Sequence, residues 1–187
     1  MKLDAEWAVG DADLAVKYRL TNRHPGAAFA YTVPRTAHRL RPYPGAAYAV
    51  LSPDDTELTL RLGVCEPPKG VMVPTRVQPL AVRIPAGQAH AGEVRLPLPI
   101  PEWDTYAPPD DPARAGRPVS VYLLHLVVEY VLERETYFRQ EAADGELWDV
   151  GGSPVRRVTA TFVPDRRLPV VGKSPQVAPL RVGAEGR

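Results

Sequence analysis

Prolines are spread along the whole chain and limit the folds that are open to it. The chain has 22 prolines in 187 residues, more than twice the average usage of about 5%. They lie between short apolar runs rather than in one tract. Because proline removes a backbone donor and breaks helices, this spacing argues against long helices and favours short strands joined by ordered loops.

The apolar runs between the prolines alternate with a period of two residues. In residues 14–22, Leu14, Val16, Tyr18 and Leu20 are separated by polar or small side chains. This pattern predicts a strand with one buried and one wet face. We expect residues 2–9 to pair with it. Alternation recurs in the ranges 56–65, 80–84, 94–100 and 155–163, and residues 28–33 and 46–51 predict two further short strands.

Three segments carry more specific signals. The long apolar run 119–132 has two apolar faces and predicts a central strand; a buried helix is the alternative, which its β-branched and aromatic content disfavours. Asp144-Gly145 lies between runs 137–141 and 146–150 and predicts a hairpin, with a short helix over 133–143 as the alternative. Pro97, Pro99 and Pro101 predict that their segment lies at a sheet edge or leaves the sheet partway.

Together these patterns predict an all-β fold, an immunoglobulin-like antiparallel β-sandwich of about eight to ten strands with long proline-rich loops. One domain is expected over residues 1–171, because domains commonly hold roughly 100–200 residues. Residues 172–187 are polar and rich in proline and glycine, so we expect a flexible C-terminal tail.

Two stretches resemble strands of bacterial immunoglobulin-like domains. Residues 14–22 form an alternating strand that ends in Asn22, and residues 80–100 place Pro85-Ala86-Gly87 between two strands. The resemblance covers about a fifth of the chain and implies the sandwich fold. It brings no functional residues, because such domains serve as adhesins, enzyme appendages, inhibitors and binding modules. The disulfide pair of antibody domains is excluded, since Cys65 is the single cysteine.

Charge and composition narrow the classes of partner. The formal net charge is +1, so no global field favours nucleic acid or an anionic membrane. The N-terminus meets acidic residues at once, and no apolar stretch approaches the ~18 residues of a membrane helix. With one cysteine, these features predict a cytoplasmic protein that binds neither nucleic acid nor membrane.

The sequence shows no catalytic motif and no local metal-ligand spacing. His24, His38, His90 and His125 are far apart, and no nucleophile elbow or phosphate-binding loop is present. We therefore expect no cofactor and no metal, assign no catalytic residue, and favour a protein that is not an enzyme.

His125 and Glu129 lie within the most apolar run and are candidates for a polar pocket. In a strand both side chains share one face about 13 Å apart, at ~3.3 Å per residue, so they cannot touch. In a helix they would be neighbours. A histidine satisfied by its surroundings on a solvated stretch of sheet is the favoured alternative.

Aromatic and basic residues mark candidate binding loops. Trp103 and Tyr106, with Tyr137-Phe138 and Trp148, could form a platform for a sugar or a protein, or Trp103 could fold over the core. Arg35, Arg39 and Arg41 lie in a basic loop and are further candidates for contact with a ligand or partner.

Three functions are compatible with these observations. The leading hypothesis is a non-catalytic interaction module of a bacterial cytoplasmic protein. It would bind another protein or itself through a loop surface or an exposed strand edge, the latter allowing a homodimer. The second is a carbohydrate- or small-ligand-binding domain, and the third a small hydrolase or metal enzyme built from dispersed residues such as His125, Glu129 and Cys65.

Overall fold

The computed structural model describes residues 1–35, 42–65, 77–103, 116–142 and 146–172, and over these ranges the protein is all-β. The only helical element among them is a single 3₁₀ turn, Glu133–Glu135. The strands, in chain order, are β1 (Lys2–Val9), β2 (Asp13–Thr21), β3 (Ala28–Val33), β4 (Tyr48–Leu51), β5 (Glu57–Leu62), β6 (Leu80–Ile84), β7 (Ala89–Pro97), β8 (Ile100–Pro101), β9 (Arg117–Val121), β10 (Leu123–Leu132), β11 (Thr136–Glu141), β12 (Leu147–Gly152), β13 (Arg156–Phe162) and β14 (Leu168–Gly172).

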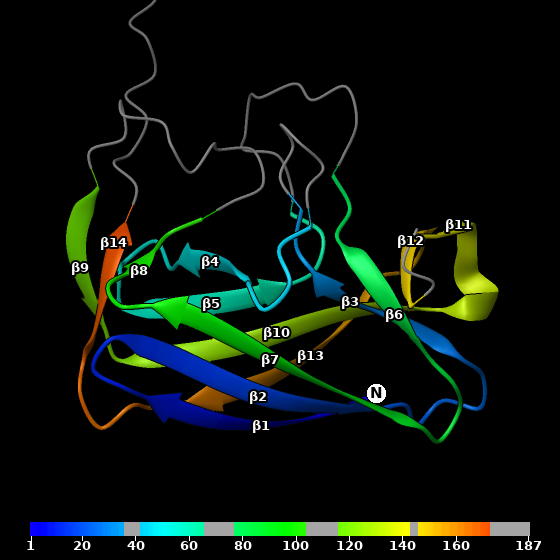
Figure 1. The fold of residues 1–187 in the computed structure, drawn as a ribbon, viewed down its shortest axis with the longest axis horizontal. Helices are drawn as coiled ribbons and strands as arrows, with labels where there is room; N and C mark the ends of the chain where they lie inside the picture. Colours follow the sequence, from blue (N-terminus) through cyan, green and yellow to red (C-terminus); the bar gives the residue numbers. More distant parts are fainter. Residues whose placement is uncertain (36–41, 66–76, 104–115, 143–145, 173–187) are drawn as a thin grey trace, which may run out of the picture.

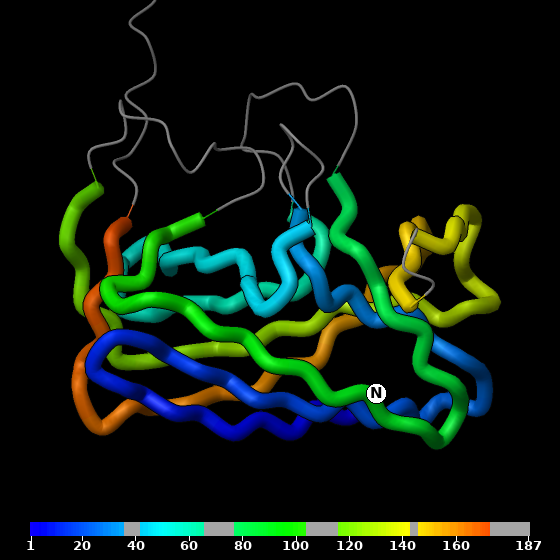
Figure 2. Tube along the Cα trace, viewed as in Figure 1, coloured from blue at the N-terminus to red at the C-terminus, as the bar shows by residue number. Residues whose placement is uncertain are grey.

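The strands form three sheets, two of which face each other (Figure 1, Figure 2). A three-stranded sheet has the order β1-β2-β7. An eight-stranded sheet has the order β11-β12-β6-β3-β10-β5-β4, with β13 paired to the other side of β10. A small sheet, β8-β14-β9, lies at one end of the molecule, and the hairpin β11–β12 lies at the opposite end. The all-β prediction is confirmed. There are more strands than expected, because the runs 94–100 and 119–132 are each divided between two sheets and β14 was not predicted.

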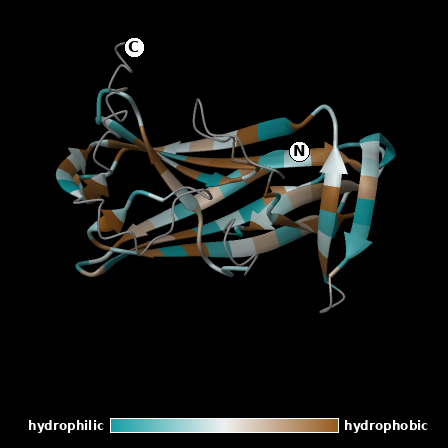
Figure 3. Ribbon diagram, turned by 90° about the horizontal axis from the view of Figure 1, so that it is seen from above, coloured by the Kyte–Doolittle hydropathy of each residue, from teal (hydrophilic) through white to brown (hydrophobic). Residues whose placement is uncertain are grey.

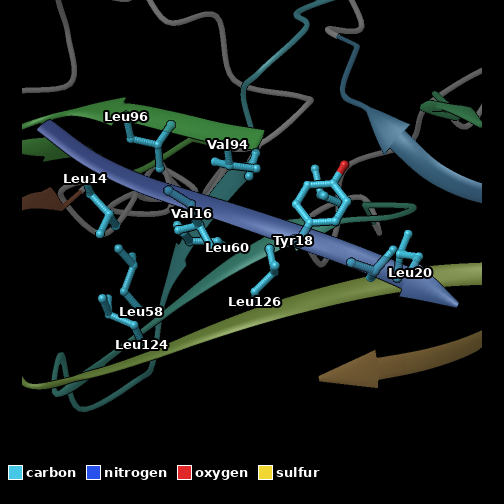
Figure 4. Packing of buried hydrophobic residues seen from close by; sticks show 14 of the residues in the cluster. Leu14, Val16, Tyr18, Leu20, Leu58, Leu60, Val94, Leu96, Leu124 and Leu126 are labelled. Atoms are coloured by element: carbon cyan, nitrogen blue, oxygen red, sulfur yellow. The ribbon is translucent and has the colours of Figure 1, made fainter. Parts of the chain in front are cut away.

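The core forms where the alternating faces of the two larger sheets meet. Leu14 and Val16 of β2 pack over Leu58 and Leu60 of β5 and Leu124 of β10 (Figure 4). Apolar and polar stretches alternate along the long strands (Figure 3). Fully burying one leucine of this kind stabilises the fold by about 1.5–3 kcal/mol. The period-two pattern therefore fixes which face of each strand is inside.

Several of the predicted local features are present. The first two strands pair antiparallel, with Leu3 opposite Leu20. The turn at residues 52–55 closes with a hydrogen bond from Asp55 N to Ser52 O of 3.0 Å. The hairpin β11–β12 is antiparallel, and its turn, residues 143–145, lies outside the described residues. The predicted tail is outside them as well, except for Gly172, which ends β14.

Asn22, at the end of β2, ties two turns together. It is fully buried, and its Nδ2 donates to the carbonyl oxygens of Gly26 and Ile84 at 2.9 Å and of Pro85 at 3.2 Å. Its Oδ1 accepts a 3.0 Å hydrogen bond from the backbone N–H of His24. The side chain thus satisfies buried carbonyls from both the β2–β3 and β6–β7 turns.

The proline-rich segment behaves as its composition predicts. β7 is the end strand of its sheet, and Pro97, opposite Asp13, is its last residue. The chain then leaves this sheet, and Ile100 and Pro101 pair with β14 instead. Proline lacks the donor that a central strand needs, so the ladder ends where the prolines begin.

Two expectations about strands were wrong. The run 119–132 is not one strand: it breaks at Tyr122, whose N–H donates to Thr56 O at 3.1 Å, and β9 and β10 belong to different sheets. The pairing is also not wholly antiparallel, because β10 pairs parallel with β5 and β14 pairs parallel with β8. Parallel neighbours need a long crossover connection, which no local sequence signal marks.

Candidate functional site

Glu129 lies where the neighbour of β10 changes. Along one side, β10 pairs with β5 as far as Val128 opposite Leu62, and with β3 from Tyr130 opposite Ala30. Odd-numbered residues of β10 face away from the main core, so Glu129 points to the outer face of the large sheet. It is nevertheless buried, with 3% of its side chain exposed.

Two groups from the end of β5 satisfy the Glu129 carboxylate. Arg61 forms an ion pair with Oε1, and the backbone N–H of Val64 donates to Oε2 at 2.9 Å. Gly63 makes this approach feasible: a Cβ at that position would lie 2.5 Å from Oε2 and 2.7 Å from the carboxyl carbon. The carboxylate thus accepts the Val64 N–H in place of a backbone carbonyl of a neighbouring strand, at the point where β5 ends.

A pocket of about 210 Å³ lies against Glu129 on this outer face. Its polar walls come from β3, β5, β10, β11 and β13 and from the segment before β6, and two valines complete it. Its lining residues are Tyr31, Arg61, Val64, Gln78, Glu129, Tyr137, Gly152, Val155 and Arg157. Arg157 of β13 stands directly opposite Glu129 in the β10–β13 register.

Tyrosines from β3 and β11 form two sides of the pocket. Burial, with Tyr137 and Glu129 nearby, raises the pKa of Tyr31, so its hydroxyl stays protonated and donates to Val150 O at 3.0 Å. The Tyr137 ring lies over Gly151, where a Cβ would come within 2.6 Å of the ring. The ladder between β11 and β12 shifts register between Thr136 and Phe138, so Tyr137 is the bulged residue. Bulges of this kind re-aim side chains.

A second, shallower depression of about 510 Å³ adjoins the pocket through Tyr137. Residues 133–139 of the β11 segment line it: Glu133, Arg134, Thr136, Tyr137, Phe138 and Arg139. Hydrogen bonds from Arg83, at 2.9 and 3.0 Å, lower the pKa of Glu133, which Arg139 also contacts. Tyr137 is 75% exposed and Phe138 46% exposed. The hairpin β11–β12 stands across the direction of the long strands (Figure 1, Figure 3).

The predicted pair, His125 and Glu129, lies on one face of β10, but the two side chains contact different partners. His125 Nε2 lies 3.2 Å from Glu57 Oε2, and Nδ1 lies 3.1 Å from Thr161 Oγ1. Glu129 lines the pocket, whereas His125 lines neither of the two depressions described above. The histidine therefore bridges an acid and a hydroxyl on the sheet surface, away from the concave site.

The predicted aromatic platform is divided between two places. Trp103 joins the edge of β4 through its backbone N–H, which donates to Ala49 O at 2.8 Å. Its ring packs on Tyr43 and Tyr48, with centroids 5.3 and 5.2 Å away. Trp148 of β12 packs edge-on against Phe29 at 5.6 Å. Four strands of the large sheet separate β12 from β4. Tyr106 lies outside the described residues.

Arg35, from the predicted basic loop, ties strands together. Its backbone N–H donates to the Tyr48 hydroxyl at 2.8 Å, and that hydroxyl donates back to Arg35 O at 2.7 Å. Its guanidinium pairs with Asp149 of β12 at 2.8 Å. Arg39 and Arg41 lie outside the described residues.

Arg61, Arg157 and the glycines at 63 and 151 were not singled out from the sequence. Each arginine occupies a polar position of an alternating strand, which looks like any solvated strand residue. The two neighbouring glycines that end β12, Gly151-Gly152, are the one local signal that could have indicated a close approach. The partners of Glu129 depend on long-range pairing and could not be found locally.

The described ranges contain no group of three or more His, Cys, Asp or Glu side chains placed to hold a metal ion. No helix within them is long and apolar enough to span a membrane. None of the family models, curated proteins or solved structures with which the chain was compared matches it. The assignment of this sandwich to the immunoglobulin-like folds accordingly stays a prediction.

Proposed function

We propose that this chain is a non-catalytic protein-interaction module that binds its partner on the face formed by the hairpin β11–β12 and the adjoining pocket. The observation that carries the proposal is the exposure of Tyr137 and Phe138 beside that pocket. Large aromatic side chains left in water at the rim of a concave site are typical of protein interfaces.

The surroundings of the two aromatics support this choice of face. Val155, in the turn before β13, is also exposed and lines the same pocket as Tyr137. Glu133 and Glu135 are already paired with Arg83, Arg139 and Arg156. These ion pairs hold the base of the hairpin in place, so the aromatic side chains extend from a preorganised support.

The edges of the sheets offer the alternative route of strand addition. Residues 102–103 cover β4, and on β7 the backbone N–H of Arg95 donates to Gly45 O at 2.8 Å. Trp7 of β1 stacks on Phe162 of β13 at 5.2 Å, which closes one side of the sandwich. These contacts make an edge-to-edge homodimer the less favoured version of the proposal.

A bacterial, cytoplasmic setting is part of the same proposal. The single thiol, Cys65, is buried, and the core holds together without a disulfide. A reducing compartment suits such a fold.

Site-specific photo-cross-linking tests the proposed face. A photoreactive phenylalanine analogue replaces Phe138 in one variant and Tyr122, which is 47% exposed and lies on the β9–β10 bend, in a matched control. We expect the position-138 variant, but not the position-122 variant, to cross-link a discrete partner in the producing cells. That partner, once purified, should bind the unmodified protein and bind the Phe138→Ala variant more weakly. Equal products from both positions, or none, would contradict the proposal.

A further inference from the structure

Arg157 is the cation in the pocket that has no carboxylate partner. Its guanidinium makes no hydrogen bond or ion pair with a described residue, although Arg157 stands opposite Glu129 in the ladder between β10 and β13. The Glu129 carboxylate is already engaged by Arg61 and by the N–H of Val64. In contrast, the preceding residue of the strand, Arg156, is paired with Glu135.

The charges around the pocket leave room for one negative group. Its lining has two arginines, Arg61 and Arg157, and one carboxylate, Glu129. The adjoining base of the hairpin adds no spare negative charge, because Glu133 and Glu135 face Arg83, Arg139 and Arg156. A single carboxylate would balance the pocket. A doubly charged phosphate would be disfavoured by the buried Glu129 carboxylate beside it.

Shape and polarity also fit a carboxylate side chain. The guanidinium of arginine presents a planar fork that matches a carboxylate with two parallel hydrogen bonds. Gln78 and the Tyr137 hydroxyl line the same pocket and can donate further hydrogen bonds. Exposed apolar surface of Tyr137 and Val155 borders it, so a residue next to the acid in a peptide would meet apolar walls.

We infer that the pocket receives an aspartate or glutamate side chain from a partner's peptide segment, paired to Arg157, with a neighbouring apolar residue against Tyr137 and Val155. This inference rests on the proposed function and names the chemistry of the partner at that face. The Glu129–Arg61 pair then acts as a positioning element: it occupies Arg61 and leaves Arg157 available to the partner.

Peptide selection on the full chain tests the inference. A phage-displayed random peptide library is selected against the purified protein, and the enriched peptides are synthesised with their acidic residue intact, changed to glutamine, or changed to phosphoserine. Binding is measured by calorimetry to the wild type, Arg157→Met, Arg157→Lys and Arg19→Met. Arg19 is the matched control, because it is an exposed strand arginine on β2 whose side chain makes no hydrogen bond or ion pair with a described residue.

We expect enriched peptides to combine an acidic and an apolar residue. Arg157→Met and the glutamine peptide should each weaken binding about tenfold to a hundredfold, the range for a hydrogen bond to a charged group. Arg157→Lys should recover part of the affinity, and Arg19→Met should leave it unchanged. Weaker binding at higher salt is expected as well.

The remaining outcomes separate this inference from the proposed function. Peptides that lose affinity with Phe138→Ala but not with Arg157→Met overturn the inference and leave the proposed face intact. Peptides insensitive to both substitutions overturn both. Tighter binding of the phosphoserine peptide, or self-association of the protein that Arg157→Met abolishes, overturns the carboxylate assignment in favour of a phosphopeptide or of a second copy.

Discussion

The ion pair between Arg61 and Glu129 leads to an asymmetric prediction. Its two members are buried to different extents: 3% of the Glu129 side chain is exposed, against 29% of the Arg61 side chain. Removing one partner leaves the other behind, and the cost depends on how well water can reach what is left. We therefore compare Arg61→Met, which leaves the carboxylate without its ion-pair partner, with Glu129→Gln, which leaves the guanidinium without its partner.

The structure sets the size of each effect. In Arg61→Met the buried carboxylate keeps only the Val64 N–H, and breaking a buried pair in this way costs about 3–5 kcal/mol. In Glu129→Gln the amide oxygen can still accept from Val64, and Arg61 can be partly hydrated. We expect this change to cost about 1–2 kcal/mol. The double variant should lose less unfolding free energy than the two single changes together, because it leaves no charge without a partner.

Urea unfolding followed by circular dichroism at neutral pH measures these differences. Arg95→Met is the control, since Arg95 pairs with Asp13 and Glu93 on an exposed surface and its loss should leave stability nearly unchanged. Equal losses for Arg61→Met and Glu129→Gln, or strictly additive losses in the double variant, would refute the reasoning that Glu129 is the buried and dependent partner.

Three further changes probe the frame around the site, each by urea unfolding. Asn22→Ala should cost about 2–4 kcal/mol because it strands buried carbonyls, and a loss below ~0.5 kcal/mol, the level of an ordinary surface change, would show that water replaces the amide. Gly63→Ala should cost about 1–3 kcal/mol through overpacking against Glu129; no loss would mean that Glu129 moves aside freely. Burial lowers the pKa of His90 below its usual 6.5, so its contribution to stability is present above pH 6.5 and is lost as pH falls through the lowered pKa. His90→Gln should therefore reduce the loss of stability between neutral and mildly acidic pH, and an unchanged pH dependence would contradict the assignment.

The strands themselves were largely predictable because their signals are local. Leu14 to Leu20 alternate, Gly10 and Asp144-Gly145 mark hairpin turns, and the prolines after Leu96 mark a sheet edge. The division of residues 119–132 at Tyr122 was not predictable, because it depends on β9 meeting β14 far along the chain. Strand β14 itself is short and contains Pro169, which weakens its signal.

The site was predictable only at its centre. A carboxylate inside an apolar run is unusual, and this alone makes Glu129 a candidate from the sequence. Its ion-pair partner Arg61 and the arginine opposite it, Arg157, come from β5 and β13, which flank β10 in parallel and antiparallel pairing. Register between distant strands decides which polar residues meet, and a single strand's pattern does not contain it.

A crystal structure of the protein with a selected acidic peptide tests the central claim most directly. We predict a carboxylate of the peptide within about 2.7–2.9 Å of the Arg157 guanidinium, an apolar peptide side chain against Tyr137 and Val155, and an intact Arg61–Glu129 pair. A peptide bound as an added strand along β1 or β13, with the pocket empty and Arg157 in solvent, would contradict the account.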